Sequence, residues 1–132
     1  MEKVNREIAK EELNKWLDFR LIKDRYREDN EDLMEMLLDM FEEGGLILNE
    51  DYTLTYELIH YIGEDEDVTS FNFKPRIKQK DLIKNTKGNK PGDGDARILS
   101  YMATLTGKPK DLLLEMDTID YNGATAIVST FL

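Results

Sequence analysis

The part of this sequence that most constrains the fold is its last section, residues 90–132, because turn formers divide it into short segments. It opens with turn formers and helix N-cap residues, Pro91-Gly92-Asp93-Gly94-Asp95. Residues 96–106 then repeat apolar side chains at the ~3.6-residue period of a helix, at Ile98, Leu99, Met102 and Leu105. This pattern predicts a helix with one apolar face.

Two further helical segments are expected beyond it. Gly107 ends the first helix, and Pro109 fits the first turn of the next, where its missing N–H costs nothing. That second helix has three apolar residues, Leu112, Leu113 and Met116. Asp117 then caps a final segment whose apolar residues are Ile119, Tyr121, Ala124, Ile127, Val128 and the terminal Phe131-Leu132. No side-chain set in this series suggests catalysis, so we expect these segments to pack.

The N-terminal third predicts a helical hairpin. Residues 5–17 place Ala9, Leu13, Trp16 and Leu17 along one helical face. Residues 22–43 follow a near-heptad pattern at Ile22, Tyr26, Leu33, Leu37, Met40 and Phe41. Gly44-Gly45 provides the left-handed C-cap that ends this helix. The bend between the two helices should fall within residues 18–22, although no Gly or Pro marks it.

Three short strands are expected between the helical parts. Residues 46–48 form a short apolar run, residues 53–62 alternate as a half-buried strand, and residues 68–73 return after Gly63 and four acids. Pro75 ends the last strand. The fold class is therefore α+β: an N-terminal helical hairpin, a small antiparallel sheet of two or three strands, and short C-terminal helices. We divide one domain, 1–132, into a helical module (1–45), strands (46–75), a basic and Gly-rich connector (76–95) and C-terminal helices (96–132).

Composition limits the classes of partner. The net charge of −10 opposes contact with nucleic acid or anionic membranes, and no apolar run approaches the ~20 residues of a membrane span. The absence of Cys excludes disulfides and zinc–thiolate sites, and a reducing cytoplasm is the natural compartment. Residues 74–90 reverse the charge, with seven Lys or Arg against Asp81. No aromatic lies among them to stack on a base, so we interpret them as a solvated connector.

No catalytic, cofactor-binding or metal-binding residues are predicted, and we do not expect an enzyme. His60 is the only histidine, and a metal site needs several donors at suitable spacing. Asp93 and Asp95 lack the later ligands of a calcium-binding loop, so we expect Asp95 to cap the helix with Asp93 beside it. The serines have no nucleophile-elbow context. The loop 86–95 should be the most flexible stretch.

The helix predicted over 22–43 is also the candidate protein interface. Its apolar residues are spread over more than one stripe, with Met34, Met36 and Leu38 broadening the seam. Self-association or docking of a partner helix is expected through Leu33, Leu37, Met40 and Phe41.

The order of turn signals resembles a known family. Gly92-Asp93-Gly94-Asp95-Ala96-Arg97, Leu105-Thr106-Gly107-Lys108-Pro109, Leu114-Glu115-Met116-Asp117 and the closing Phe131-Leu132 resemble the tail assembly chaperones of long-tailed bacteriophages. The resemblance covers about residues 46–132, and residues 1–45 would be an added helical module. It implies a strand pair and a Gly/Asp-rich loop before a short helix, a Thr-Gly-x-Pro turn and a final helical segment.

The resemblance also implies a function. It implies a non-enzymatic protein that binds other tail proteins, such as the tape-measure protein, in the cytoplasm of the infected cell before they assemble. An alternative from another class is an acidic DNA mimic, or another small phage inhibitor, that occupies a nucleic-acid-binding protein of the host. Such a mimic should present regularly spaced carboxylates on one face, and the basic residues 74–90 count against it.

Overall fold

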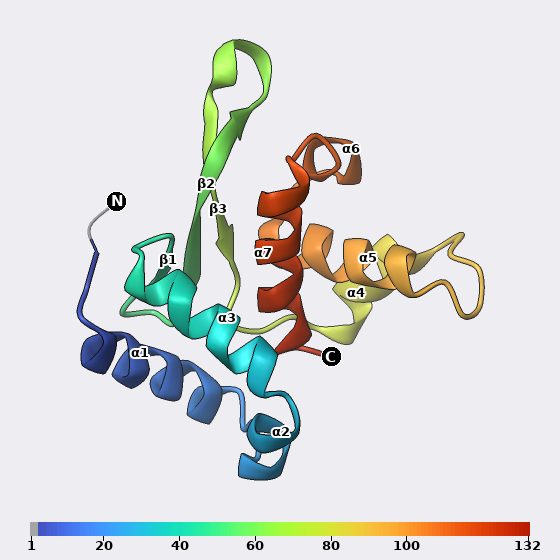
Figure 1. The fold of residues 1–132 in the computed structure, drawn as a ribbon. Helices are drawn as coiled ribbons and strands as arrows, with labels where there is room; N and C mark the ends of the chain where they lie inside the picture. Colours follow the sequence, from blue (N-terminus) through green and yellow to red (C-terminus); the bar gives the residue numbers. More distant parts are fainter. Residues whose placement is uncertain (1–2) are drawn as a thin grey trace.

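The N-terminal part of the protein is a helical hairpin with a short helix at its bend (Figure 1). The computed structural model describes residues 3–132, and here the chain forms α1 (Arg6–Phe19), α2 (Asp24–Asp29) and α3 (Glu31–Glu42). Arg6 at the start of α1 forms ion pairs with three carboxylates of α3, those of Glu35, Asp39 and Glu42. The beginning of α1 therefore lies beside the end of α3, so the two helices are antiparallel.

The prediction of a single helix over residues 22–43 is wrong, because the chain leaves helical geometry at Asn30. The backbone of Asn30 has φ −127° and ψ 46°, and its side-chain amide donates to the carbonyl oxygen of Tyr26 at 2.8 Å. Asn forms such local bonds readily in competition with the helical ladder. The heptad pattern of the sequence thus continues across a break in the helix, and this local hydrogen bond of Asn30 accompanies the break.

Both predicted helix ends in this part are confirmed, each with the hydrogen bonds of a Schellman motif. After α3, Gly44 has φ 82°, and Gly45 N donates to Met40 O. After α1, within the predicted bend, Leu21 takes the same left-handed position with φ 60°, and Ile22 N donates to Leu17 O. The bend carried no sequence marker because a leucine stands where glycine is usual.

The predicted small antiparallel sheet of two or three strands is confirmed, and it has three. Strands β1 (Leu46–Leu48), β2 (Leu54–Ile62) and β3 (Val68–Phe73) are antiparallel in the order β1-β2-β3, and the 3₁₀ turn η1 (Glu64–Glu66) joins the last two. The β2–β3 hairpin extends away from the helices (Figure 1). Its pairing is irregular, because residues 58–61 stand opposite the single residue Thr69 between two regular pairs.

The C-terminal helices are present as expected, with two local corrections. They are α4 (Gln79–Thr86), α5 (Gly94–Thr106), α6 (Lys110–Leu113) and α7 (Thr118–Ser129). The connector 76–95, which the sequence analysis described only as basic, Gly-rich and solvated, contains the helix α4 and is therefore partly helical. The N-cap of α5 is Asp93 and not Asp95, since the Asp93 carboxylate accepts from Ala96 N at 3.1 Å.

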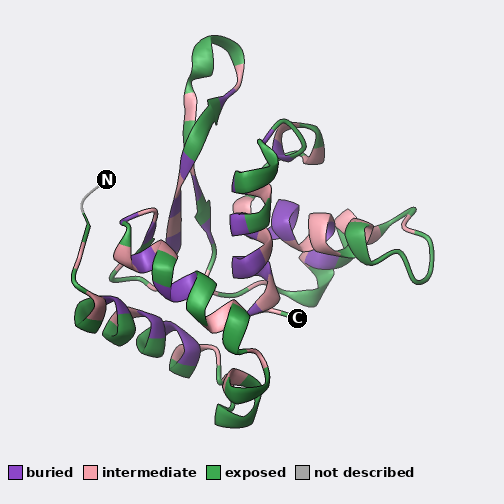
Figure 2. Ribbon diagram, viewed as in Figure 1, coloured by how far each residue is buried: buried purple, intermediate pink, exposed green. Residues whose placement is uncertain are grey.

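One hydrophobic cluster joins the N-terminal hairpin to the rest of the chain (Figure 2). The sheet contributes Leu54, Phe71 and Phe73, the C-terminal helices contribute Met102, Leu105, Leu113 and Ile127, and α1 contributes Trp16 and Leu17. The Trp16 indole N–H donates to the Thr130 hydroxyl at 3.1 Å, so α1 is tied to the end of the chain. Within residues 3–132, no helix combines the length and the apolar character that crossing a bilayer requires.

Candidate functional site

The four residues predicted as an interface lie on α3, and the structure places two of them inside the core. The side chains of Leu37 and Phe41 are 1% and 3% exposed, whereas Leu33 and Met40 are half-buried and pack against the same cluster. The breadth of the apolar stripe follows from the neighbours of α3, which packs against α1, α7 and β1. Leu37 and Phe41 are therefore committed to internal packing, and a partner could reach only the rim of this face.

A groove between α1 and β1 is the apolar opening of the molecule, and we call it the α1–β1 groove. Its volume is about 510 Å³, and it is lined by Val4, Ile8, Glu12, Phe41, Gly44, Leu46, Ile47, Leu48 and Glu57. A second hollow of about 330 Å³ shares Glu12 and Leu48 with it and continues along α1 to Lys15. Ile8 and Ile47 are 45% and 42% exposed in a mostly apolar lining. The groove therefore offers apolar surface that residues 3–132 leave uncovered.

The wall formed by β1 is an edge of the sheet, since within residues 3–132 β1 pairs with β2 alone. Glu57 N donates to Gly45 O at 2.8 Å and Asn49 N donates to Thr53 O at 2.9 Å, so residues 45 and 49 face β2. In an antiparallel pair such residues alternate with residues whose N–H and C=O groups point the other way. The main-chain groups of Leu46 and Leu48 therefore point away from β2, and only those of the half-buried Leu48 are accessible, because Leu46 is 2% exposed.

Two carboxylates give the groove a negative charge. Glu12 forms an ion pair with Lys15 at 3.2 Å, which offsets part of its charge. Glu57 forms no ion pair with any of residues 3–132 and is half-buried. The free carboxylate of Glu57 therefore favours a cation beside the apolar lining.

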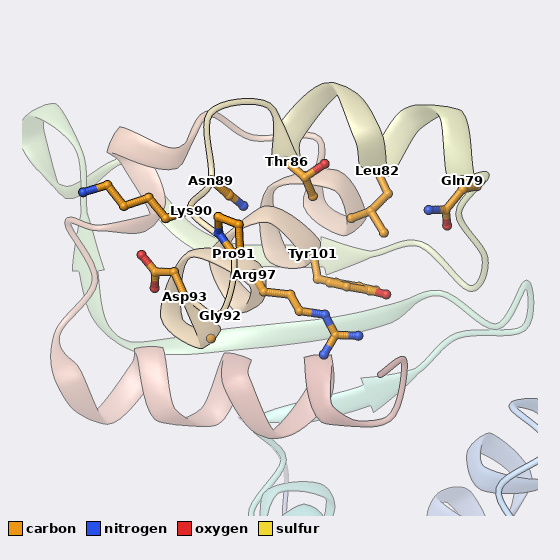
Figure 3. A pocket seen from close by; sticks show the side chains of 11 residues that line it. Gln79, Leu82, Thr86, Asn89, Lys90, Pro91, Gly92, Asp93, Arg97 and Tyr101 are labelled. Carbon is orange, nitrogen blue, oxygen red and sulfur yellow. The ribbon is translucent and has the colours of Figure 1, made fainter.

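A second opening lies between α4, the Gly-rich loop and α5 (Figure 3). Its volume is about 540 Å³, and seven of its eleven lining residues have polar side chains: Gln79, Thr86, Asn89, Lys90, Asp93, Arg97 and Tyr101. The Arg97 guanidinium lies 5.4 Å from the centre of the Tyr101 ring, whereas Lys90 points away from both (Figure 3). These cationic groups do not converge on one point, so the opening presents no focused anion site.

The Gly-rich loop is anchored, which its sequence did not indicate. The Asn89 side chain donates to the Ser100 hydroxyl at 2.9 Å, and that hydroxyl lies 2.8 Å from the carbonyl oxygen of Asn85. The Asn85 amide donates in turn to Thr104 at 2.8 Å. Ser100 and Thr104 are buried, so this polar network joins α4 and the loop to α5.

Sequence analysis missed a buried carboxylate, that of Asp120 in the first turn of α7. It is fully buried and accepts three hydrogen bonds, from the Tyr56 hydroxyl at 2.8 Å and from Ile59 N and His60 N at 2.9 Å each. The two main-chain donors belong to the irregular stretch of β2, where β3 offers them no regular partner. Burial together with the Asp120 carboxylate raises the pKa of Tyr56 above its ordinary range.

The residues weighed as catalytic or metal-binding candidates do not converge. His60 is exposed on β2, whereas Asp93 and Asp95 lie at the start of α5. The four acids that follow Gly63 are also remote from these residues, because they are exposed at the hairpin tip. No group of three or more His, Asp or Glu side chains suited to a metal ion occurs within residues 3–132.

Comparison with known proteins gives no relative. No protein-family model, no curated protein and no solved structure matches this chain.

Proposed function

We propose that this protein is a non-enzymatic tail assembly chaperone that binds other phage tail proteins, such as the tape-measure protein, in the cytoplasm of the infected cell. The sequence resemblance over residues 46–132 supports the proposal. One structural observation supports it most directly: the α1–β1 groove combines exposed apolar side chains with an open strand edge. Such a groove suits a segment of another polypeptide better than a small polar substrate.

The charge of the molecule supports a basic partner. The net charge is −10, and the groove contains the free carboxylate of Glu57. Complementary charge raises the rate of encounter with a basic partner and disfavours acidic ones. The proposed client is therefore a tail protein with a basic and apolar segment that the chaperone covers before assembly.

Affinity capture during infection tests this function. The tagged protein is expressed in cells undergoing phage infection, isolated, and its bound proteins are identified by mass spectrometry. We expect a tail protein to be recovered in stoichiometric amount by the wild type and by Leu114→Asp, which changes an exposed side chain outside the groove. Recovery of host nucleic-acid-binding proteins instead would contradict the proposal and favour the acidic mimic.

The acidic mimic has less support. The regularly spaced carboxylates of α3 include Glu35, Asp39 and Glu42, and all three form ion pairs with Arg6. Lysines of residues 74–90 are exposed. A mimic of the DNA backbone needs a continuous face of unpaired negative charge, because phosphate contacts dominate the affinity of DNA-binding proteins.

A further inference from the structure

We infer that the α1–β1 groove takes an extended segment of the partner, which adds to β1 as a fourth strand and places a Lys or Arg beside Glu57. This inference rests on the proposed function, because it assigns the mode of binding and the chemistry of the client segment. The segment alternates apolar side chains with basic ones, since successive residues of a strand point to opposite faces.

The outer main-chain groups of Leu48 are available for this pairing. Leu48 directs its N–H and its C=O away from β2, and no main-chain hydrogen bond outside the sheet reaches them within residues 3–132. The corresponding groups of Leu46 point the same way, but Leu46 is only 2% exposed. Edge strands with such unpaired groups are ready templates for another strand. Added strands gain affinity from main-chain hydrogen bonds and specificity from alternate side-chain pockets.

The dimensions of the groove fit a short strand. The walls on α1 extend from Ile8 to Lys15, which corresponds to roughly 10 Å at ~1.5 Å per helical residue. Three extended residues at ~3.3 Å each cover the same length, and β1 itself has three residues. An added strand would also bury Ile8 and Ile47, whose side chains are now about half-exposed.

Charge and shape favour a basic segment over a second copy of this chain. A second copy would bring its own Glu57 and a net charge of −10 to the interface. The β1 strand of a second copy would also bring the α1 helix of that copy with it. That helix would have to enter a groove whose other wall is already formed by the α1 of the first copy. A single extended segment from another protein meets neither obstacle.

Strand addition is tested by fluorescence anisotropy with labelled peptides of roughly eight residues that alternate Lys with Val, Ile or Leu. The controls are peptides that alternate Glu with the same residues, and Lys peptides methylated on alternate main-chain nitrogens. We expect the Lys peptides to bind and both controls to bind at least about tenfold more weakly. Amide hydrogen exchange should slow at Leu48 when the Lys peptide is bound.

Two variants locate the site. Leu48→Pro removes the outward N–H of β1 and leaves the ladder to β2 intact, so peptide binding should fall about tenfold. Glu57→Gln should weaken the Lys peptide several-fold, and less so at high salt. Glu64→Gln makes the same charge change at the hairpin tip and should leave binding unchanged. Circular dichroism checks that each variant is folded. If Leu48→Pro does not fold, the binding of Glu57→Gln decides the result.

Several outcomes would overturn the inference. They are absence of binding by every Lys peptide, equal binding of the methylated peptides, or no slowing of exchange at Leu48. A dimer in light scattering that Leu48→Pro abolishes would assign the groove to a second copy instead. If Leu48→Pro still captures a tail protein in infected cells, strand addition fails and the chaperone function stands. If the peptides bind but no tail protein is captured, the chaperone function fails.

Discussion

The buried carboxylate of Asp120 should be one of the most important side chains for stability, and Asp120→Ala tests this. The change removes the acceptor of three hydrogen bonds, those from Tyr56, Ile59 and His60. A buried polar donor left without a partner costs about 1–3 kcal/mol, and removing one partner of a buried charged network costs about 3–5 kcal/mol. The main-chain donors are only partly buried and can reach water, so we expect a loss of about 3–5 kcal/mol rather than the sum of three full costs.

This loss should be large in a thermal scan. For a domain of this size, 1 kcal/mol corresponds to a shift of about 4 °C in the melting temperature. Asp120→Ala should therefore melt about 12–20 °C below the wild type in scanning calorimetry, with a matching fall in the urea midpoint. Hydrogen exchange at Ile59 and His60 should accelerate selectively, since their N–H groups lose their acceptor.

Asp117→Ala is the matched control for the Asp120 variant. Asp117 lies three residues earlier on the same helix end, is exposed, and caps α7 by accepting from Ile119 N at 2.9 Å. Loss of a cap costs about 0.5–2 kcal/mol, so this variant should be the milder one. If Asp120→Ala loses no more stability than Asp117→Ala, the three hydrogen bonds to β2 do not have the energetic role we assign to them.

Three further predictions concern single residues. Gly123→Ala should lower the free energy of unfolding by about 1–3 kcal/mol, because a Cβ there would lie 2.7 Å from the Tyr56 hydroxyl oxygen; an unchanged urea midpoint would contradict this contact. Leu21→Gly should raise it by about 1 kcal/mol in the same assay, because Leu21 holds φ 60° with a side chain that is 81% exposed, and a loss of stability would refute this reading. The free energy of unfolding should also fall as pH rises above about 10, because the unfolded chain loses the Tyr56 proton there while the folded protein retains it. The slope of this fall should be up to ~1.4 kcal/mol per pH unit. Urea titrations from neutral to alkaline pH should show a smaller slope for Tyr56→Phe than for the wild type.

The sequence predicted the elements whose signals are local. Gly44 and Gly107 ended their helices as expected, and each has positive φ. The alternation over residues 53–62 predicted a half-buried strand, and the structure has β2 there with Leu54, Tyr56 and Leu58 buried on one face. In each case a residue's own conformational preference, or a period of about two or 3.6 residues, is sufficient for the prediction.

The misses depended on choices that short patterns do not resolve. The heptad pattern of residues 22–43 does not show whether Asn30 continues the helix or bonds back to Tyr26. At the start of α5, Asp93 and Asp95 are both good caps, and the structure uses the earlier one. Capping residues within a few positions of each other give nearly equal signals, so element boundaries are the weakest part of such a prediction.

Long-range contacts explain why the candidate sites were not predictable. In the sequence, Asp120 is an ordinary acidic residue in the first turn of a helix. Its role in stability comes from its hydrogen bonds to Tyr56 and to a bulged strand some sixty positions earlier. The groove was also not predictable from local patterns, because Ile8 and Ile47 belong to elements that meet only after α1 has folded back on α3. An apolar stripe on a helix therefore predicts that something covers it, but whether the cover is internal depends on the whole chain. The stripe of Leu37 and Phe41 is covered from within, and the free surface lies instead beside the shortest strand of the sheet, where local patterns are weakest.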